Sequence, residues 1–188
     1  MQMVNAPATP EFSRAVPLSE IGAATRPRHL VADAGERAAL ARRFGLLALD
    51  RLEADVTLHP DGAGYLVEGR LRGEAQQACV ASGEPVPARI EEDFRIRFVA
   101  EAGHDAADAA DAADAEVELD ADDCDTLFHD GRAIDLGEAV AESFALALDP
   151  FPRSPDADAA LKAAGVKEEG EAGPFGALAA LREKLEKK

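Results

Sequence analysis

The side chains of this sequence that could bind another molecule are mainly arginines, and many of them alternate with apolar residues. In residues 86–99, Ile90, Phe94 and Ile96 fall on one face of an extended chain, and Arg95 and Arg97 fall on the other. This period of two is typical of a half-buried β-strand with one side in water. Guanidinium groups on such a face could contact phosphate groups or a protein. The candidate binding residues are Arg26, Arg28, Arg42, Arg43, Arg70, Arg72, Arg89, Arg95 and Arg97.

The same arginines alternate with carboxylates, which allows a second interpretation. The acidic positions are Glu68, Glu74, Glu91 and Asp93. Cross-strand ion pairs would keep this face of the sheet in solution, and each exposed pair would stabilise the fold only slightly. On the face that carries the arginines no aromatic residue stands among them, so the pattern does not indicate stacking on nucleic-acid bases. Both interpretations fit the sequence.

No group of residues in the sequence predicts catalysis, a metal site or a cofactor. There is no phosphate-binding loop, dinucleotide-binding glycine pattern or nucleophile elbow. The four histidines stand in unrelated contexts, and no carboxylate sits in an apolar run that would raise its pKa. The acidic run from Asp120 fails as a calcium loop, because Asp125 takes the position where glycine is needed. We therefore predict a binding protein, and not an enzyme.

The net charge of −17 is concentrated in one segment. Residues 1–100 carry 12 arginines against 14 carboxylates, residues 101–149 carry one arginine against 16 carboxylates, and residues 150–188 carry seven charges of each sign. The N-terminal half is thus nearly neutral and rich in arginine. The acidity of the whole chain therefore does not exclude contact between that half and a polyanion.

The cysteines and the N-terminus indicate the compartment. Cys79 and Cys124 are too few for a disulfide scaffold and lack the spacing of metal ligands, so we expect reduced thiols. The first residues contain no basic segment followed by an apolar run, and the sequence has no stretch of the roughly 18 apolar residues that span a bilayer. We predict a soluble cytoplasmic protein with no membrane contact.

Three long strands, at 48–59, 64–76 and 86–99, would position the arginines. Short turns join them, at Pro60-Asp61-Gly62 and at Ser82-Gly83-Glu84-Pro85. Strands connected in this way form a three-stranded antiparallel meander. Residues 11–17 predict a further strand at the edge of the sheet, because Pro17 cannot donate a backbone hydrogen bond.

Two helices are expected to cover the meander. Asp33 can cap a helix over 35–44 that ends at Gly45. Asp135 can cap a second helix that runs to Leu148, with Glu138 completing an acidic capping box. The apolar stripe of this second helix is long enough to lie across the open face of the strands. We predict an α+β fold, in which an antiparallel β-sheet or a partly open barrel has helices packed on one face.

The predicted domain organisation has one folded domain with extensions. Residues 1–10 are a flexible lead, residues 11–155 form a single α+β domain with an acidic, solvated insertion at 101–115, and residues 156–188 are a tail. The tail contains an amphipathic helix over 174–187. Its apolar stripe could complete the core or bind in the groove of a partner. The stripe consists of Phe175, Leu178, Leu181 and Leu185.

Two segments in this order and spacing resemble the YceD-like family, the bacterial and plastid proteins associated with accumulation of large-subunit ribosomal RNA. They are CVASGEPVPARIEEDFRIRF (79–98) and DGRAIDLGEAVAESFALALDPFPRSP (130–155), with the acidic insertion between them. The resemblance covers about 11–155, and the C-terminal segment resembles the short tail of family members. Some members carry further cysteines after the second segment that could hold a metal. Residues 151–161 contain none, so zinc binding is not transferred to this chain.

The resemblance implies a non-enzymatic factor in biogenesis of the large ribosomal subunit. Such a factor would support 23S ribosomal RNA accumulation by binding that RNA or an early ribosomal particle, and a basic ribosomal protein could be a further partner. The alternative is an acidic adaptor or chaperone-like protein that binds a basic client without touching RNA. The resemblance supplies no catalytic residue.

Overall fold

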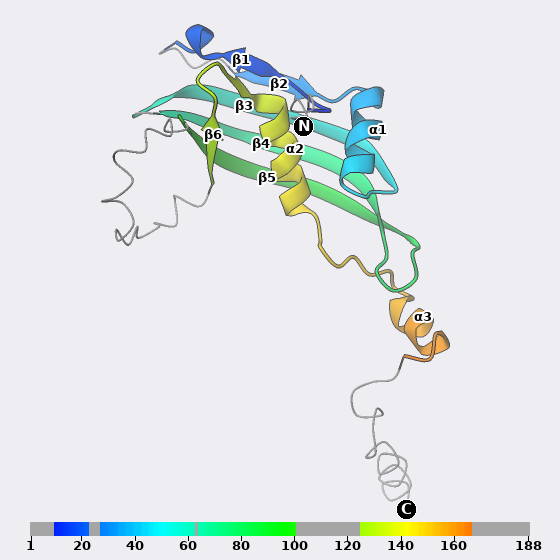
Figure 1. Ribbon diagram of the computed structural model, residues 1–188. Helices are drawn as coiled ribbons and strands as arrows, with labels where there is room; N and C mark the ends of the chain where they lie inside the picture. The colour runs from blue at the N-terminus through cyan, green and yellow to red at the C-terminus, as the bar shows by residue number, and fades with distance from the viewer. Residues whose placement is uncertain (1–9, 23–26, 63, 101–124, 167–188) are drawn as a thin grey trace, which may run out of the picture. The chain divides into compact units, whose positions relative to one another are not determined.

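The computed structural model describes residues 10–22, 27–62, 64–100 and 125–166 (Figure 1). The expected flexible lead, the acidic insertion at 101–115 and the amphipathic helix at 174–187 lie outside these residues, apart from Pro10. The chain divides into two compact units. The first comprises Met1–Gln76 with Pro87–Asp149, and the second comprises Gln77–Val86 with Pro150–Lys188. Each unit is described by itself.

An open five-stranded sheet, in the order β2-β3-β4-β5-β6, forms the framework (Figure 1). The predicted meander is confirmed by β3 (Ala48–Asp61), β4 (Gly64–Ala78) and β5 (Pro85–Ala100). Strand β2 (Arg28–Val31) pairs antiparallel with β3 at one edge. At the other edge, β6 (Thr126–His129) pairs parallel with β5, so the sheet is mixed. The α+β class is confirmed, and the sheet does not close into a barrel.

The register of β3 and β4 separates an apolar inner face from a charged outer face. Leu52 lies opposite Gly73, and Ala54 lies opposite Leu71, with all three side chains buried. The intervening residues carry charge, and Asp55 lies opposite Arg70 on the outer face. A register shift between Leu49 and Arg51 interrupts this alternation once, so that Leu49 and Leu52 are both buried although they are three residues apart.

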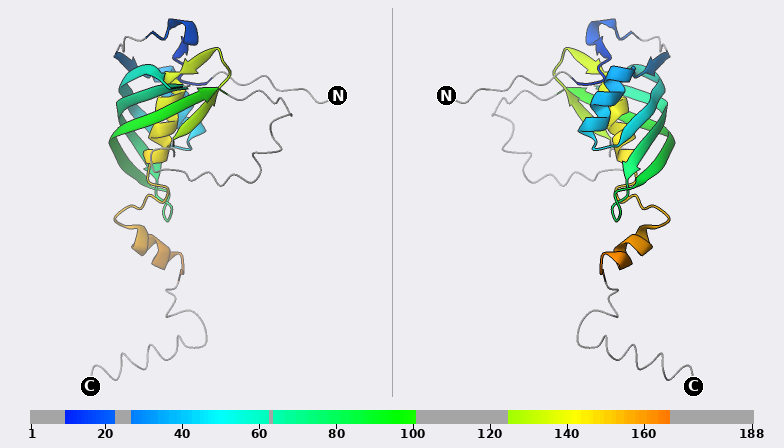
Figure 2. Two further views of the ribbon diagram at one scale, coloured as in Figure 1. Left: turned by 90° about the vertical axis from the view of Figure 1, so that its left-hand side faces the viewer. Right: turned by 90° about the vertical axis from the view of Figure 1, so that its right-hand side faces the viewer.

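Helix α2 (Leu136–Ala147) packs on the inner face at a glycine. Phe144 is fully buried, and its ring occupies the space where a side chain at Gly73 would project. Figure 2 shows the sheet curving around this helix, with α1 (Ala34–Arg43) on the same side of the sheet. Leu40 of α1 belongs to the same buried cluster as Phe144. The predicted packing of helices on one face is therefore confirmed.

The helix caps agree with the sequence in one respect and differ in another. Asp33 and Glu36 form a reciprocal capping box at the start of α1. Asp135 caps α2 as predicted, because its Oδ1 atom accepts hydrogen bonds from the backbone of Gly137 at 3.0 Å and Glu138 at 3.2 Å. The expected capping box with Glu138 does not form. The Glu138 carboxylate instead binds the guanidinium of Arg43 on α1.

A small second sheet joins the N-terminal part of the chain to the start of α2. Strand β1 (Ala15–Pro17) pairs antiparallel with β7 (Ala133–Asp135), so that Val16 lies opposite Ile134. The strand expected over 11–17 is therefore shorter and pairs outside the main sheet. Both Val16 and Ile134 are buried, and they extend the core beyond the meander.

In the second unit, the β4–β5 turn is held to the chain after α2. Gly83 adopts φ 76°, and its N–H donates to the Cys79 carbonyl at 2.8 Å. The Val80 N–H donates to the carbonyl of Pro152 at 2.9 Å. A short helix, α3 (Ala157–Ala163), follows.

We expect Gly73→Ala to reduce the free energy of unfolding by about 1–3 kcal/mol, measured by chemical denaturation. A Cβ at this position would lie 2.3 Å from Cε2 of Phe144. The control is Gly22→Ala, where a Cβ would meet nothing within 4 Å and the expected change is below about 0.5 kcal/mol. Adding Phe144→Leu to Gly73→Ala should recover part of the loss. Equal stability of the two alanine variants would contradict this packing.

Candidate functional site

Five of the candidate arginines project from β4 and β5 onto the outer face of the sheet, and each contacts a carboxylate. Their side chains remain 33% to 81% exposed. The register explains the contacts, because acidic and basic residues occupy facing and diagonal positions on neighbouring strands. The pairs are Arg70 with Glu91 (3.3 Å), Arg72 with Asp55 (3.0 Å), Arg89 with Glu74 (3.4 Å), Arg95 with Glu68 (3.4 Å) and Arg97 with Asp61 (3.0 Å).

These pairs connect into a network around Arg72. Its guanidinium also lies 3.7 Å from Glu53 and 3.6 Å from Glu91. The hydrogen bond that Arg72 donates to Asp55, together with the contact from His29, holds the pKa of the Asp55 carboxyl below its ordinary value. The Asp55 carboxylate therefore stays ionised at neutral pH, and every outer-face arginine in the described network lies beside a carboxylate.

Sequence reasoning missed two members of this face. Arg51 binds Glu53 at 2.5 Å and approaches Glu74 at 3.9 Å, and His29 lies 2.8 Å from Asp55. The signal for Arg51 was present, because it alternates outward with Glu53 along β3. With Arg51 included, six guanidinium groups face seven carboxylates among the described residues of this face. The face is therefore charged but close to neutral.

The remaining candidate arginines do not join this face. Arg28 lies opposite Val56, a buried residue, so it projects from the inner side at the edge of the sheet. Arg42 and Arg43 lie in the last turn of α1, and Arg26 lies outside the described residues.

Arg43 of α1 is bound to Glu138 of α2. Its Nη1 and Nη2 atoms lie 2.9 Å and 2.6 Å from the carboxylate oxygens of Glu138, and Nη1 is also 3.1 Å from Glu11. The hydrogen bond to Glu138 raises the pKa of the Arg43 guanidinium above its ordinary value. All three side chains are about two-thirds buried or more. This arginine therefore has a clear structural role.

A polar cluster around Cys79 occupies the second unit. The Cys79 Sγ atom accepts a hydrogen bond from the Ser154 N–H at 3.3 Å, and the Ser154 and Ser82 hydroxyls are 3.4 Å apart. Hydrogen bonds from Ser154, with a smaller one from Ser82, lower the pKa of the thiol to about 6. Structural zinc sites use thiolate, imidazole and carboxylate ligands, so one thiol and two hydroxyls do not fit zinc. No described residues form a group of three or more such ligands.

The family model for the large ribosomal RNA subunit accumulation protein YceD matches residues 67–182. The chain belongs to the YceD family. The match includes all five paired arginines of β4 and β5, helix α2 and the Cys79 cluster, and it begins later than the resemblance that the sequence motifs indicate. No curated protein and no solved structure matches the chain significantly.

Membership of the YceD family supports a role in accumulation of large ribosomal RNA, and therefore in ribosome biogenesis. None of the helices in the described part of the chain combines the length and hydropathy that crossing a bilayer requires. The family match assigns no binding residue, so the outer-face arginines and the apolar stripe at 174–187 remain predictions.

We expect Arg43→Met to lower the free energy of unfolding by about 1–2 kcal/mol, because it leaves the Glu138 carboxylate without its bidentate partner. Arg42→Met is the matched control. Arg42 is exposed and forms no ion pair with a described residue, so the expected change is below about 0.5 kcal/mol. Chemical denaturation of both variants measures the difference. Equal losses would show that the contact with Glu138 does not stabilise the fold.

We expect the Cys79 thiol to titrate near pH 6 in the folded protein, because donated hydrogen bonds stabilise the thiolate. The ultraviolet absorbance of the thiolate in a Cys124→Ser background measures this titration. Ser154→Ala should raise the pKa. The pKa of the thiol in the folded protein lies below its usual value of about 8.5. The thiolate therefore contributes its full stabilisation of the fold above about pH 8.5, and this stabilisation is lost as the pH falls towards 6. A midpoint at the ordinary value would contradict the arrangement.

Proposed function

We propose that this chain is a non-enzymatic factor that supports 23S ribosomal RNA accumulation in the bacterial cytoplasm by binding an early large-subunit particle. The observation that carries the proposal is the outer face of the sheet, where guanidinium groups of three neighbouring strands remain partly exposed. The family description supports the process, and this face is the surface that we assign to ribosomal RNA.

The ion pairs on this face do not prevent RNA binding. Each pair is exposed to solvent, and such pairs stabilise a folded protein by about 0–1 kcal/mol. Exchange of a carboxylate partner for an RNA phosphate therefore costs little stability. A guanidinium group also has five N–H donors, more than one carboxylate can accept, so donors remain for a phosphate.

The near-neutral charge of the face sets how it would bind. A strongly basic patch would hold any nucleic acid, whereas the outer-face carboxylates repel phosphates that are not aligned with a guanidinium. We infer that the affinity of the face for RNA alone is modest and that its binding depends on the shape of the particle. The predicted solvated insertion at 101–115 would be kept away from RNA by its negative charge.

Sedimentation of the tagged full chain with ribosomal precursors, followed by crosslink mapping, tests the proposal. We expect Arg89→Gln with Arg95→Gln to weaken co-sedimentation about tenfold and to reduce its salt dependence, because two phosphate contacts are removed. The matched control is Arg132→Gln with Arg153→Gln. These two arginines are exposed, carry the same charge and lie outside the outer face.

Two outcomes would contradict contact with RNA. One is equal sedimentation of the two double variants. The other is recovery of the same protein partners after ribonuclease treatment, which would favour the alternative of an acidic adaptor that binds a basic client without RNA.

A further inference from the structure

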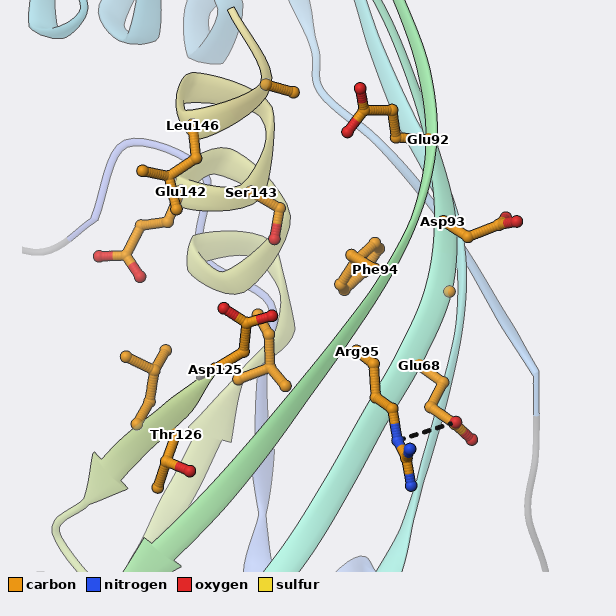
Figure 3. A pocket seen from close by; sticks show the side chains of 14 residues that line it. Glu68, Glu92, Asp93, Phe94, Arg95, Asp125, Thr126, Glu142, Ser143 and Leu146 are labelled. Carbon is orange, nitrogen blue, oxygen red and sulfur yellow. Dashed lines mark ion pairs between the residues drawn. The ribbon is translucent and has the colours of Figure 1, made fainter. Parts of the chain in front are cut away.

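A groove of about 860 Å³ lies between α2 and the middle of β5 (Figure 3). Phe94 and Ile96 line it on β5, Leu127 lines it on β6, and Ser143 and Leu146 line it on the helix. Phe94 is only partly buried, and Leu146 is 84% exposed. The groove thus presents apolar surface that the described part of the chain leaves uncovered.

The edge of β5 borders this groove. Pairing with β6 begins at Arg97, whose N–H donates to the carbonyl of Asp125 at 2.8 Å. Backbone groups alternate between the two edges of a strand, so the N–H and C=O groups of Asp93 and Arg95 point to the same side as those of Arg97. Among the described residues, no strand pairs with this edge of β5 on the N-terminal side of Arg97. An unpaired edge of this kind is a template for another strand.

The groove is also acidic. Glu92, Asp125 and Glu142 line it, and none of them forms an ion pair with a described basic residue. Arg95 is the basic residue among the lining side chains, and Figure 3 shows it turned towards Glu68 on the other side of β5, where the two are 3.4 Å apart. Burial, together with the nearby Glu138 carboxylate, raises the pKa of Glu142. A cation in the groove would therefore offset an unfavourable charge.

We propose that this groove binds an extended, lysine- or arginine-bearing segment of a partner protein, which adds to β5 as a strand. Three observations favour this occupant. The free backbone edge selects an extended chain over a helix. The partly buried Phe94 and the exposed Leu146 favour a segment that carries some apolar side chains. The unpaired carboxylates select basic side chains and repel the phosphates of RNA.

The pleat of the added strand specifies its sequence pattern. Side chains on one face would point towards α2, where Glu92 and Glu142 receive basic groups and Phe94 contacts an apolar group. The other face would point to solvent beside Asp93. Binding at this groove does not depend on whether the outer face contacts RNA, so the two proposals can fail independently.

The test uses the full chain and a capped synthetic peptide, Lys-Val-Lys-Thr-Lys-Val-Lys-Thr, with amide hydrogen exchange followed by nuclear magnetic resonance. We expect the amides of Asp93 and Arg95 to exchange at least about tenfold more slowly with the peptide. The amides of Glu92 and Phe94 point towards β4 and should change little. A peptide with glutamate in place of lysine should give no protection.

Charge variants provide the second measurement. Glu92→Gln with Glu142→Gln should weaken peptide binding about tenfold, whereas Glu20→Gln with Asp50→Asn, which removes the same charge from exposed positions outside the groove, should not. N-methylation of alternate peptide residues should abolish binding for one of the two sets only, because only one backbone edge of the peptide pairs with β5.

Four results would overturn the proposal. The first two are equal peptide binding by the two double variants and equal binding of the two N-methylated peptides. The third is that an RNA oligonucleotide, and not the peptide, protects the amides of Asp93 and Arg95. The fourth is a tenfold gain in peptide affinity when residues 167–188 are deleted. The last result would identify the chain's own tail as the occupant. A gain in affinity of about tenfold corresponds to about 1.4 kcal/mol of binding free energy.

Discussion

The close approach of α2 to the sheet depends on the missing side chain at Gly73. The ring of Phe144 fills that space and is fully buried, so the helix can lie directly on the inner face. Asp135 sets the direction of approach, because its carboxylate holds the first turn of α2 and also accepts hydrogen bonds from the Arg14 N–H at 2.7 Å and the Ser13 hydroxyl at 2.5 Å. One capped end and one buried ring thus fix the helix against the strands. The charged outer face and the groove beside β5 are consequences of this arrangement.

Much of the fold followed from the sequence, because its elements are specified by local patterns. Alternation of apolar and charged residues located β3, β4 and β5 within a few residues, and Asp33 and Asp135 marked the helix starts. Strand β6 could not be found in this way. It has four residues, stands after the acidic segment and pairs in parallel with β5, so its place depends on tertiary contacts and not on a local turn. The partner of Glu138 was missed for a similar reason, since Arg43 lies 95 positions away in the sequence.

The sequence predicted that candidate arginines share one face of the sheet, but not which carboxylate each of them contacts. The period of two placed Arg70, Arg72 and Arg95 on one side of the strands, but partners across strands depend on register, and register is set by turns and by the irregularity near Leu49. For the same reason, the sequence grouped Arg28, Arg42 and Arg43 with these residues although the structure places them elsewhere. The groove has no sequence signal of its own, because it arises where β5 extends beyond β6 and α2 leaves part of the inner face uncovered.

The two proposed surfaces differ in the way charge is balanced, and this difference assigns their partners. On the outer face every carboxylate of the network faces a guanidinium, so a polyanion can bind only by exchanging with existing partners. In the groove the carboxylates of Glu92 and Glu142 form no ion pair with a described residue, so a basic segment could bind them without displacing an existing partner. A particle that contains both RNA and basic protein segments would satisfy the two surfaces at once. RNA alone or a basic protein alone would engage only one of them.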